Sequence, residues 1–245
     1  EHNNPSHYFD VEHILGIPKK TDNPKYLEKI RNITTSFKEL KDKHNGKPHP
    51  IKGTPLNVYK DTGTNPYRVG ELFQRAKDLM KCASQRSGTN FTTPLFPLNG
   101  SVIVEDTSCR KDTGRLEALL GSTVLMGLMG HFVADLSQPQ HASADYNGWL
   151  TGQGGLHAYF ETEIVHALDD NLMALISQRI MELKSSSLLN QRLGSDWRNL
   201  DATKLMFRLI ADSFSQLDHL RELDRKHSLI EESVRDDAKG IKTYA

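Results

Sequence analysis

The stretch Ala118–His141, "ALLGSTVLMGLMGHFVADLSQPQH", indicates the fold more strongly than any other part of the chain. From Ala118 to Ala134 it runs through seventeen residues without Asp, Glu, Lys or Arg. That run is shorter than the roughly 20 residues of a membrane span, and it carries glycines and a histidine. We therefore expect a buried central helix. Its small residues would let neighbouring helices approach closely: Gly121, Ser122, Gly127 and Gly130.

The rest of the 245-residue chain also has apolar residues mainly at helical spacing, and strand signals are scarce. There is no internal repeat or linker, so the sequence predicts an all-α fold with one multi-helix domain over residues 1–245. Segments 44–66 and 84–108 are rich in Gly, Pro, Asn and Thr and predict long covering loops; "SVIVED" in the second suggests a short extended piece. The predicted helices span Pro24–His44, Pro66–Ala83, Asp112–Asp135, Leu156–Lys184 and Leu200–Ser228.

Charge and cysteine content narrow the class of protein. With 31 basic and 31 acidic residues the formal net charge is zero, which excludes a broad basic field for nucleic acid or acidic membranes but leaves room for local patches. The two cysteines, Cys82 and Cys109, form one disulfide if the protein is exported, or else are two buried thiols. The chain opens "EHNNPSHYFD" without a basic and apolar leader, as in a cytoplasmic protein, a processed mature protein or a fragment.

A histidine and a carboxylate stand at the end of the predicted central helix. His131 and Asp135 are four residues apart, so they project from one helix face about a turn apart and can hold one ion. If the helix is buried, the Asp135 carboxylate needs a partner, because burying an unpaired charge costs several kcal/mol. Pro139 then ends the helix, and His141 follows where the chain can curl back.

The same spacing recurs sixteen residues further on. In "GLHAYFETE", His157 and Glu161 are four apart near the start of another predicted helix, after the glycine-rich loop "ASADYNGWLTGQGG". Imidazole and carboxylate are the ligands of zinc where thiolate is absent. Five such ligands exceed the need of one tetrahedral ion, so we expect more than one metal in a cleft between helices.

The opposite interpretation is that such pairs arise by chance. The chain has two more, His166 with Asp170 and His227 with Glu231, which we expect on solvated faces. A lone His131 would more often be a hydrogen-bonded core histidine. The joint occurrence of the first two pairs around one loop favours a metal site.

"HFVADLSQPQH" followed by "GLHAYFE" resembles the zinc-dependent phospholipase C and single-strand-specific nuclease superfamily. In that family an HxxxD motif, a QP turn, a further histidine and an Hxxx(D/E) motif hold three zinc ions in an all-α fold. "SHYFDVE" and "TNPYRVGELFQ" are also similar to family segments, so the resemblance covers about Ser6 to Val165.

The resemblance implies a role for each matching residue. His7, His131 and Asp135 would serve a paired metal site, with Asp135 bridging two ions and with His131 and Asp135 essential for catalysis. The remaining zinc would be held by His141, His157 and Glu161. Zinc lowers the pKa of bound water and neutralises charge on phosphate oxygens, so the implied activity is phosphodiester hydrolysis. Secretion or a periplasmic location is also implied.

One departure from the family is serious. The resemblance implies an N-terminal tryptophan, a histidine soon after it and an aspartate as further ligands, and this set is not visible before His7. The family's long closing helix is also missing after "DDAKGIKTYA". We therefore expect that pieces of the natural protein are absent at both ends or lie on another chain, with His2 as an alternative ligand.

The substrate is left open between two phosphodiesters. Glu161 and the short loop before it favour a phospholipid headgroup, because many of the family's nucleases have aspartate there and a longer loop. The nuclease alternative would use Tyr8 to stack on an unpaired base and Asp10 to read its edge. Tyr146 and Trp149 flank the expected metals and could wall either substrate, or simply pack. A third alternative is a non-catalytic, zinc-stabilised helical binding domain.

Overall fold

The protein is described by a computed structural model that covers residues 4–86, 109, 113–163, 169–185 and 200–227. Helices make up its regular structure; within these ranges the only β-type pairing is an isolated bridge between Pro48 and Pro55. The all-α prediction is confirmed. The elements are α1 (Val11–Leu15), α2 (Pro24–Arg31), α3 (Phe37–His44), η1 (Val58–Thr62), α4 (Asn65–Ser84), α5 (Arg115–Ser137), η3 (Pro139–Ala142), η4 (Trp149–Thr151), α6 (Leu156–Ala158), η5 (Tyr159–Glu163), α8 (Asp169–Ser185), α10 (Ala202–Phe214) and α11 (Leu217–His227).

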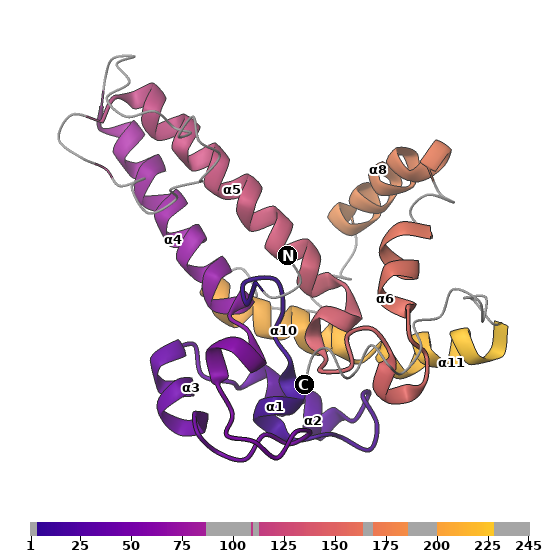
Figure 1. The fold of residues 1–245 in the computed structure, drawn as a ribbon. Helices are drawn as coiled ribbons and strands as arrows, with labels where there is room; N and C mark the ends of the chain where they lie inside the picture. The colour runs from indigo at the N-terminus through magenta and orange to yellow at the C-terminus, as the bar shows by residue number, and fades with distance from the viewer. Residues whose placement is uncertain (1–3, 87–108, 110–112, 164–168, 186–199, 228–245) are drawn as a thin grey trace.

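Helices α4 and α5 form a long antiparallel pair, and α10 crosses its lower end (Figure 1). Ser122 of α5 is fully buried and donates a hydrogen bond to the carbonyl of Ala76 on α4, at 3.2 Å. At the crossing, a Cβ on Gly70 would lie 2.0 Å from Oγ1 of Thr203. Only glycine permits so close an approach of α10 to α4.

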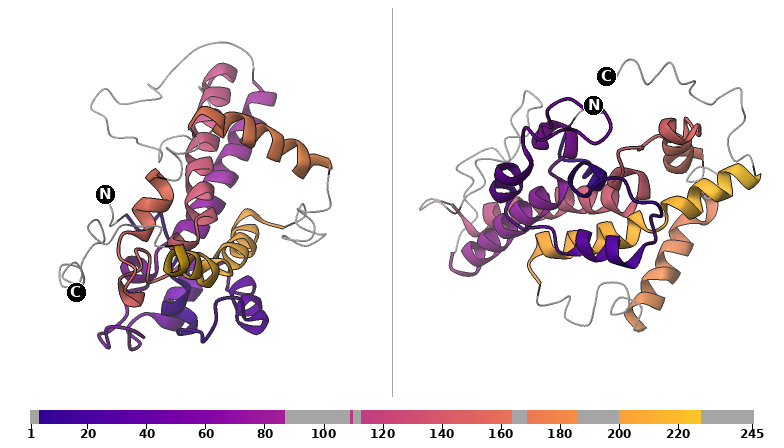
Figure 2. Two further views of the ribbon diagram at one scale, coloured as in Figure 1. Left: turned by 90° about the vertical axis from the view of Figure 1, so that its right-hand side faces the viewer. Right: turned by 90° about the horizontal axis from the view of Figure 1, so that it is seen from below.

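The core lies where α10 meets α2, α4 and the N-terminal segment (Figure 2). Phe207 of α10 is fully buried, and its ring lies 5.3 Å from that of Phe9 and 5.7 Å from that of Tyr67. Tyr26 of α2 stacks on Phe214 at 5.7 Å. Burying each such ring contributes about 1.5–3 kcal/mol. This core fixes the N-terminal segment beside the end of α5.

Helix α5 is not buried on all sides, so that prediction is wrong. Gly121 and Ser122 are buried, and Ser122 contacts α4, but Gly127 and Gly130 are exposed and have open space where a Cβ would stand. Only 33% of the most apolar 18-residue window is buried, because α4 covers one side of the helix. Among the described helices α5 is the one long and apolar enough to cross a membrane by length and composition. The absence of a transmembrane segment therefore stays a prediction.

Two predicted helices are broken by local polar groups. The predicted helix Pro24–His44 starts at Pro24 but ends at Arg31, and α3 begins after Ser36, whose hydroxyl accepts from Glu39 N. The predicted helix Leu200–Ser228 is interrupted after Phe214, where the Ser215 hydroxyl donates to the carbonyl of Asp212. Serine favours such turns and caps over helix interiors because its hydroxyl bonds to nearby backbone.

Other predictions have mixed outcomes. Helices α4 and α5 agree with prediction within a few residues, except that position 112 lies outside the described residues. The predicted helix Leu156–Lys184 appears as α6 with η5 and, separately, α8; residues 164–168 between them are not described. Between the end of α3 at His44 and the start of α4 at Asn65, the predicted loop is irregular apart from η1 and the Pro48–Pro55 bridge. "SVIVED", His2, the side chain of His227 and both residues 166 and 231 lie outside the described part.

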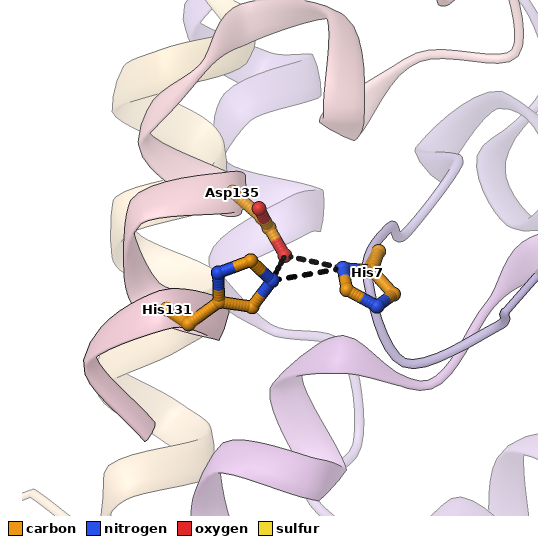
Figure 3. Close-up of side chains that lie close together, drawn as sticks. All are labelled: His7, His131 and Asp135. Atoms are coloured by element: carbon orange, nitrogen blue, oxygen red, sulfur yellow. Dashed lines mark hydrogen bonds and ion pairs between the residues drawn. The ribbon is translucent and has the colours of Figure 1, made fainter. Parts of the chain in front are cut away.

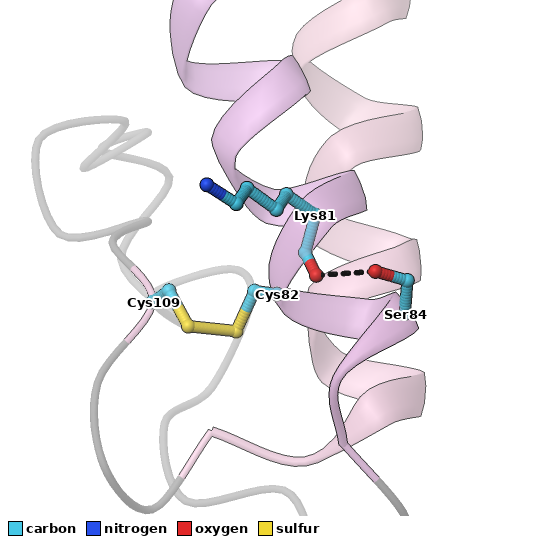
Figure 4. The surroundings of a disulfide bond; sticks show 4 residues. All are labelled: Lys81, Cys82, Ser84 and Cys109. Atoms are coloured by element: carbon cyan, nitrogen blue, oxygen red, sulfur yellow. Dashed lines mark hydrogen bonds between the residues drawn. A yellow bond between two sulfur atoms is a disulfide. The ribbon is translucent and has the colours of Figure 1, made fainter.

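A disulfide joins Cys82, near the end of α4, to Cys109, with the two Cα atoms 5.8 Å apart (Figure 4). The disulfide alternative for the two cysteines is therefore correct. The two bonded cysteines are 27 residues apart in sequence. Closing a loop of this length lowers the entropy of the unfolded chain, which stabilises the fold by about 3–4 kcal/mol. The bridge sits at the end of the α4–α5 pair that lies away from α10 (Figure 1).

Candidate metal centre

The structure gathers all six predicted metal ligands into two groups, each of which could hold a metal ion. The first ligand group is His7, His131 and Asp135, and the second ligand group is His141, His157 and Glu161. Within each group, one nitrogen or oxygen of every member lies within 4.8 Å of the others. Each group thus offers two imidazoles and one carboxylate.

The first ligand group joins the N-terminal segment to the last turns of α5 (Figure 3). Nδ1 of His7 lies 2.9 Å from Oδ2 of Asp135 and 3.2 Å from Nε2 of His131. Nε2 of His131 lies 3.6 Å from the same carboxylate oxygen. Two ring nitrogens that face each other at this distance repel unless one is protonated or a cation lies between them. The three atoms therefore suit either a shared proton or a bound cation.

Backbone contacts hold His7 in place. Phe9 N donates to the carbonyl of His141 at 2.9 Å, and Asp10 N donates to that of Thr62 at 2.8 Å. Gly63 has φ +88°, and a Cβ there would lie 2.1 Å from the carbonyl oxygen of Tyr8. Because His7 and Phe9 are two residues apart, the His141 backbone lies within about 10 Å of His7. The two ligand groups are therefore neighbours.

The second ligand group is built by η3, α6 and η5. Oε1 of Glu161 lies 2.9 Å from Nε2 of His141 and 3.0 Å from Nε2 of His157. Partial burial raises the pKa of Glu161, but hydrogen bonds and charges from the two histidines outweigh it, so the net pKa lies well below the ordinary value. Glu161 is thus a carboxylate at neutral pH, the form that binds a cation.

The donor spacing in both groups fits a small divalent ion. Four ligands at the 2.0–2.1 Å bond lengths of zinc in tetrahedral geometry stand about 3.3 Å apart. The nitrogen–nitrogen and nitrogen–oxygen separations given above are 2.9–3.6 Å in the first group and 2.9–3.0 Å in the second. Three protein ligands leave one position open, as catalytic zinc sites require. The same distances also fit direct hydrogen bonds between these side chains.

A buried ion pair fixes the loop that leads to His157. The carboxylate of Asp145 accepts from Leu150 N at 2.7 Å, from the Thr151 hydroxyl at 2.9 Å and from Nη2 of Arg221 at 3.1 Å. The side chains of Asp145 and Arg221 are only 6% and 11% exposed. Burial raises the pKa of Asp145, and the Leu150, Arg221 and Thr151 contacts oppose that rise. The loop is thereby tied to α11.

Further buried contacts tie both ends of the same loop. Nε2 of Gln153 donates to the Arg221 carbonyl and to the fully buried carboxylate of Asp224, at 2.8 and 2.7 Å. Oδ1 of Asn147 accepts from His157 N at 3.2 Å. At the loop's start, the carboxylate of Glu12 accepts hydrogen bonds from the Ser143 hydroxyl and from the backbone N–H of Ala144. These groups orient His157 and the turn after His141.

The predicted substrate residues lie in the two stretches of sequence that carry His7 and His157. Tyr146 packs edge-on against His157 at 5.6 Å between ring centroids, and Trp149 packs against Tyr146 at 5.2 Å. Tyr8 is half-buried and donates its hydroxyl to the Lys60 carbonyl at 2.5 Å. The side chain of Asp10 is 13% exposed, and burial followed by Glu12 and Asp61 raises its pKa. All four stay predictions as substrate contacts.

The sequence did not identify the supporting residues Asp145, Arg221, Gln153 and Asn147. Arg221 is 76 residues from Asp145, and no periodicity links them. Asparagine and aspartate in "SADYNG" read as turn formers, which they also are. Only a contact across the fold reveals that they hold a histidine in position.

No family model, no curated protein and no solved structure matches this chain. The resemblance to the zinc-dependent phospholipase C and nuclease superfamily therefore rests on the sequence motifs alone. The two ligand groups are independent of it, because they are defined by atoms that converge in the fold.

Proposed function

We propose that this chain is a zinc-dependent phosphodiester hydrolase of phospholipase C type, as its motifs suggest. The observation that carries the proposal is the convergence of the six predicted residues into two adjacent groups of three. If the two histidine–carboxylate pairs had arisen by chance, we would not expect each of them to have a third metal-binding side chain beside it. His7 joins the first group from 128 residues away in sequence.

Bound zinc would supply activated water and would neutralise charge on the phosphate. The chain's own residues would fix its position: Asp135 and His131 from one face of α5, and Glu161 between two histidines. Tyr146, packed on His157, would limit the space beside the second group. Export to an oxidising compartment is part of the proposal, and the Cys82–Cys109 disulfide supports it.

The proposal is tested by metal content and by two substrates. The purified protein, never exposed to chelator, is analysed for zinc and other divalent metals, since two histidines and a carboxylate also suit non-haem iron. It is then incubated with phosphatidylcholine and with single-stranded DNA. Zinc in the protein and release of phosphocholine are expected. Cleavage of DNA alone would favour the nuclease alternative, and zinc without either activity would favour the binding domain.

Replacing Asp135 by Asn should abolish hydrolysis while leaving the helix intact. The amide is isosteric with the carboxylate, so packing of α5 is kept, but it carries no charge for a cation. Activity is measured as product released per mole of folded protein, with circular dichroism as the check on folding. Turnover equal to wild type would contradict the assigned role of Asp135.

A further inference from the structure

Basic residues are unevenly distributed along this neutral chain. Residues 19–60 hold eleven of the 31 basic residues but only four of the 31 acidic ones. Within the part formed by α3 and the segment up to η1, six lysines are exposed to solvent. We call these six the basic surface: Lys38, Lys41, Lys43, Lys47, Lys52 and Lys60.

The basic surface adjoins the first ligand group. Lys60 provides the carbonyl that accepts the hydroxyl of Tyr8, which is the neighbour of His7. Helices α2 and α3 lie at the end of the molecule away from the free ends of α4 and α5 (Figure 1, Figure 2). Burial, followed by the charges of Lys43 and Lys47, lowers the pKa of His44.

The six lysines outnumber the carboxylates of the same stretch, which are the exposed Glu39 and Asp42 of α3 and the adjacent Asp61. Lys52 approaches the carboxylate of Asp61 at 4.0 Å with its side chain 45% exposed. Within the described residues, the other five lysines of the surface form no ion pair with a carboxylate. Since unpaired like charges repel, such a cluster is favourable mainly when an anionic partner binds it.

Two large apolar side chains in the same stretch of sequence are also exposed. Ile51 is 37% exposed and Tyr59 is 48% exposed. Ile51 lies in a loop closed by the Pro48–Pro55 bridge and by the hydrogen bond from His49 N to the Thr54 carbonyl. An aliphatic side chain beside lysines suits the headgroup–acyl boundary of a membrane, where Lys and an apolar side chain act together. It offers neither stacking nor hydrogen bonds to a nucleic acid base.

We propose that the basic surface docks on an anionic phospholipid membrane, with its lysines near the headgroups and with Ile51 and Tyr59 entering the interface. Each lysine near an anionic leaflet strengthens binding by about 1 kcal/mol, or about fivefold. The loop and α3 would thus hold the first ligand group close to the lipid surface. This inference goes beyond the proposed hydrolysis and does not require turnover.

The test is co-sedimentation of the full chain with phosphatidylcholine vesicles prepared with and without phosphatidylglycerol. We expect binding only to the anionic vesicles, weakened by added salt. The triple variant K41Q/K43Q/K47Q should bind roughly a hundredfold more weakly. A matched triple, K77Q/K81Q/K226Q, removes equally exposed lysines elsewhere and should bind as wild type does. Lipid phosphate released in the same tubes is assayed separately, so loss of hydrolysis is not mistaken for loss of docking.

A second variant distinguishes binding to a membrane from binding to any polyanion. Ile51→Ser keeps every charge and should weaken vesicle binding about tenfold, because an apolar side chain no longer enters the interface. Equal binding of wild type to neutral and anionic vesicles would overturn the proposal. So would an equal loss in the two lysine triples, or tighter binding to single-stranded DNA that Ile51→Ser leaves unchanged.

Discussion

The two ligand groups have the same chemistry but are constructed differently. The second takes all three ligands from residues 141–161, and its connecting loop is fixed by buried polar contacts to α1 and α11. The first takes two ligands from α5 and one from the N-terminal segment, and the side chain of His131 is 57% exposed. Local sequence and a buried polar network preorganise the second group, whereas the first depends on how the N-terminal segment docks.

This difference predicts how each group fails. Damage to α11 should affect the second group, and damage to the segment around His7 should affect the first. Variants that separate the two groups test the comparison directly.

The largest expected effect comes from removing a ligand. His157→Ala should eliminate metal binding at the second group and His131→Ala at the first, each by more than the roughly 10–100-fold that loss of an outer-shell partner costs. Equilibrium dialysis with zinc and metal analysis measures the number of ions retained. His219→Ala, an exposed histidine of α11, is the control. Unchanged zinc binding in either ligand variant would show that the corresponding group is only hydrogen-bonded.

Arg221→Gln should both destabilise the protein and weaken the second group. It leaves the buried Asp145 carboxylate without its cation, which costs about 3–5 kcal/mol. Urea unfolding measures the stability, and zinc affinity at each group is measured in the His131→Ala and His157→Ala backgrounds. We expect a 10–100-fold loss at the second group alone. The exposed Arg225→Gln on the same helix is the matched control, and an equal effect there would contradict the positioning role.

His13 should make stability sensitive to acid on the N-terminal side. Burial lowers its pKa from 6.5 to about 4, with His49 and Lys52 adding to the fall and the Asp61 contacts opposing it. The unfolded chain therefore binds the proton first, so stability is present above pH 6.5 and is lost as pH falls toward 4. This costs up to about 3 kcal/mol.

This prediction is tested by measuring the free energy of unfolding against pH in metal-free wild-type and variant proteins. His13→Gln should lose about 3 kcal/mol less than wild type between neutral pH and pH 4. His219→Gln, exposed on α11, should follow the wild-type curve. Parallel curves for wild type and His13→Gln would remove His13 as the cause. Any remaining slope would then have to come from other buried groups such as Glu12, whose pKa burial raises.

The smallest effect is expected from Gly63→Ala. The new Cβ would lie 2.1 Å from the Tyr8 carbonyl and would displace the segment that carries His7. Gly53→Ala is the control, because its φ is also positive, at +70°, but nothing lies within 4 Å. We expect Gly63→Ala to cost about 1–3 kcal/mol more than Gly53→Ala in urea unfolding. It should also weaken the first group and spare the second; the reverse order would contradict the comparison.

Much of the helical framework could be read from periodicity, because amphipathic and apolar spacing is a local property. Helices α4 and α5 and the end of α5 before Pro139 agree with that prediction. The breaks at Ser36 and Ser215 were missed, since a serine that caps a new helix looks like one tolerated inside a long helix. The full burial of α5 was also wrong, because apolar composition does not say how many neighbours cover a helix.

The sequence by itself determined the two histidine–carboxylate pairs, because a spacing of four fixes their common helix face. Packing decided that His7 meets Asp135, that Asp145 meets Arg221, and that His13 is buried against the Asp61 carbonyl. These contacts join residues 48 to 128 positions apart, and their formation depends on the whole core around α10. Periodicity encodes neighbours along one helix; it carries no information on which distant side chains the assembled core brings together.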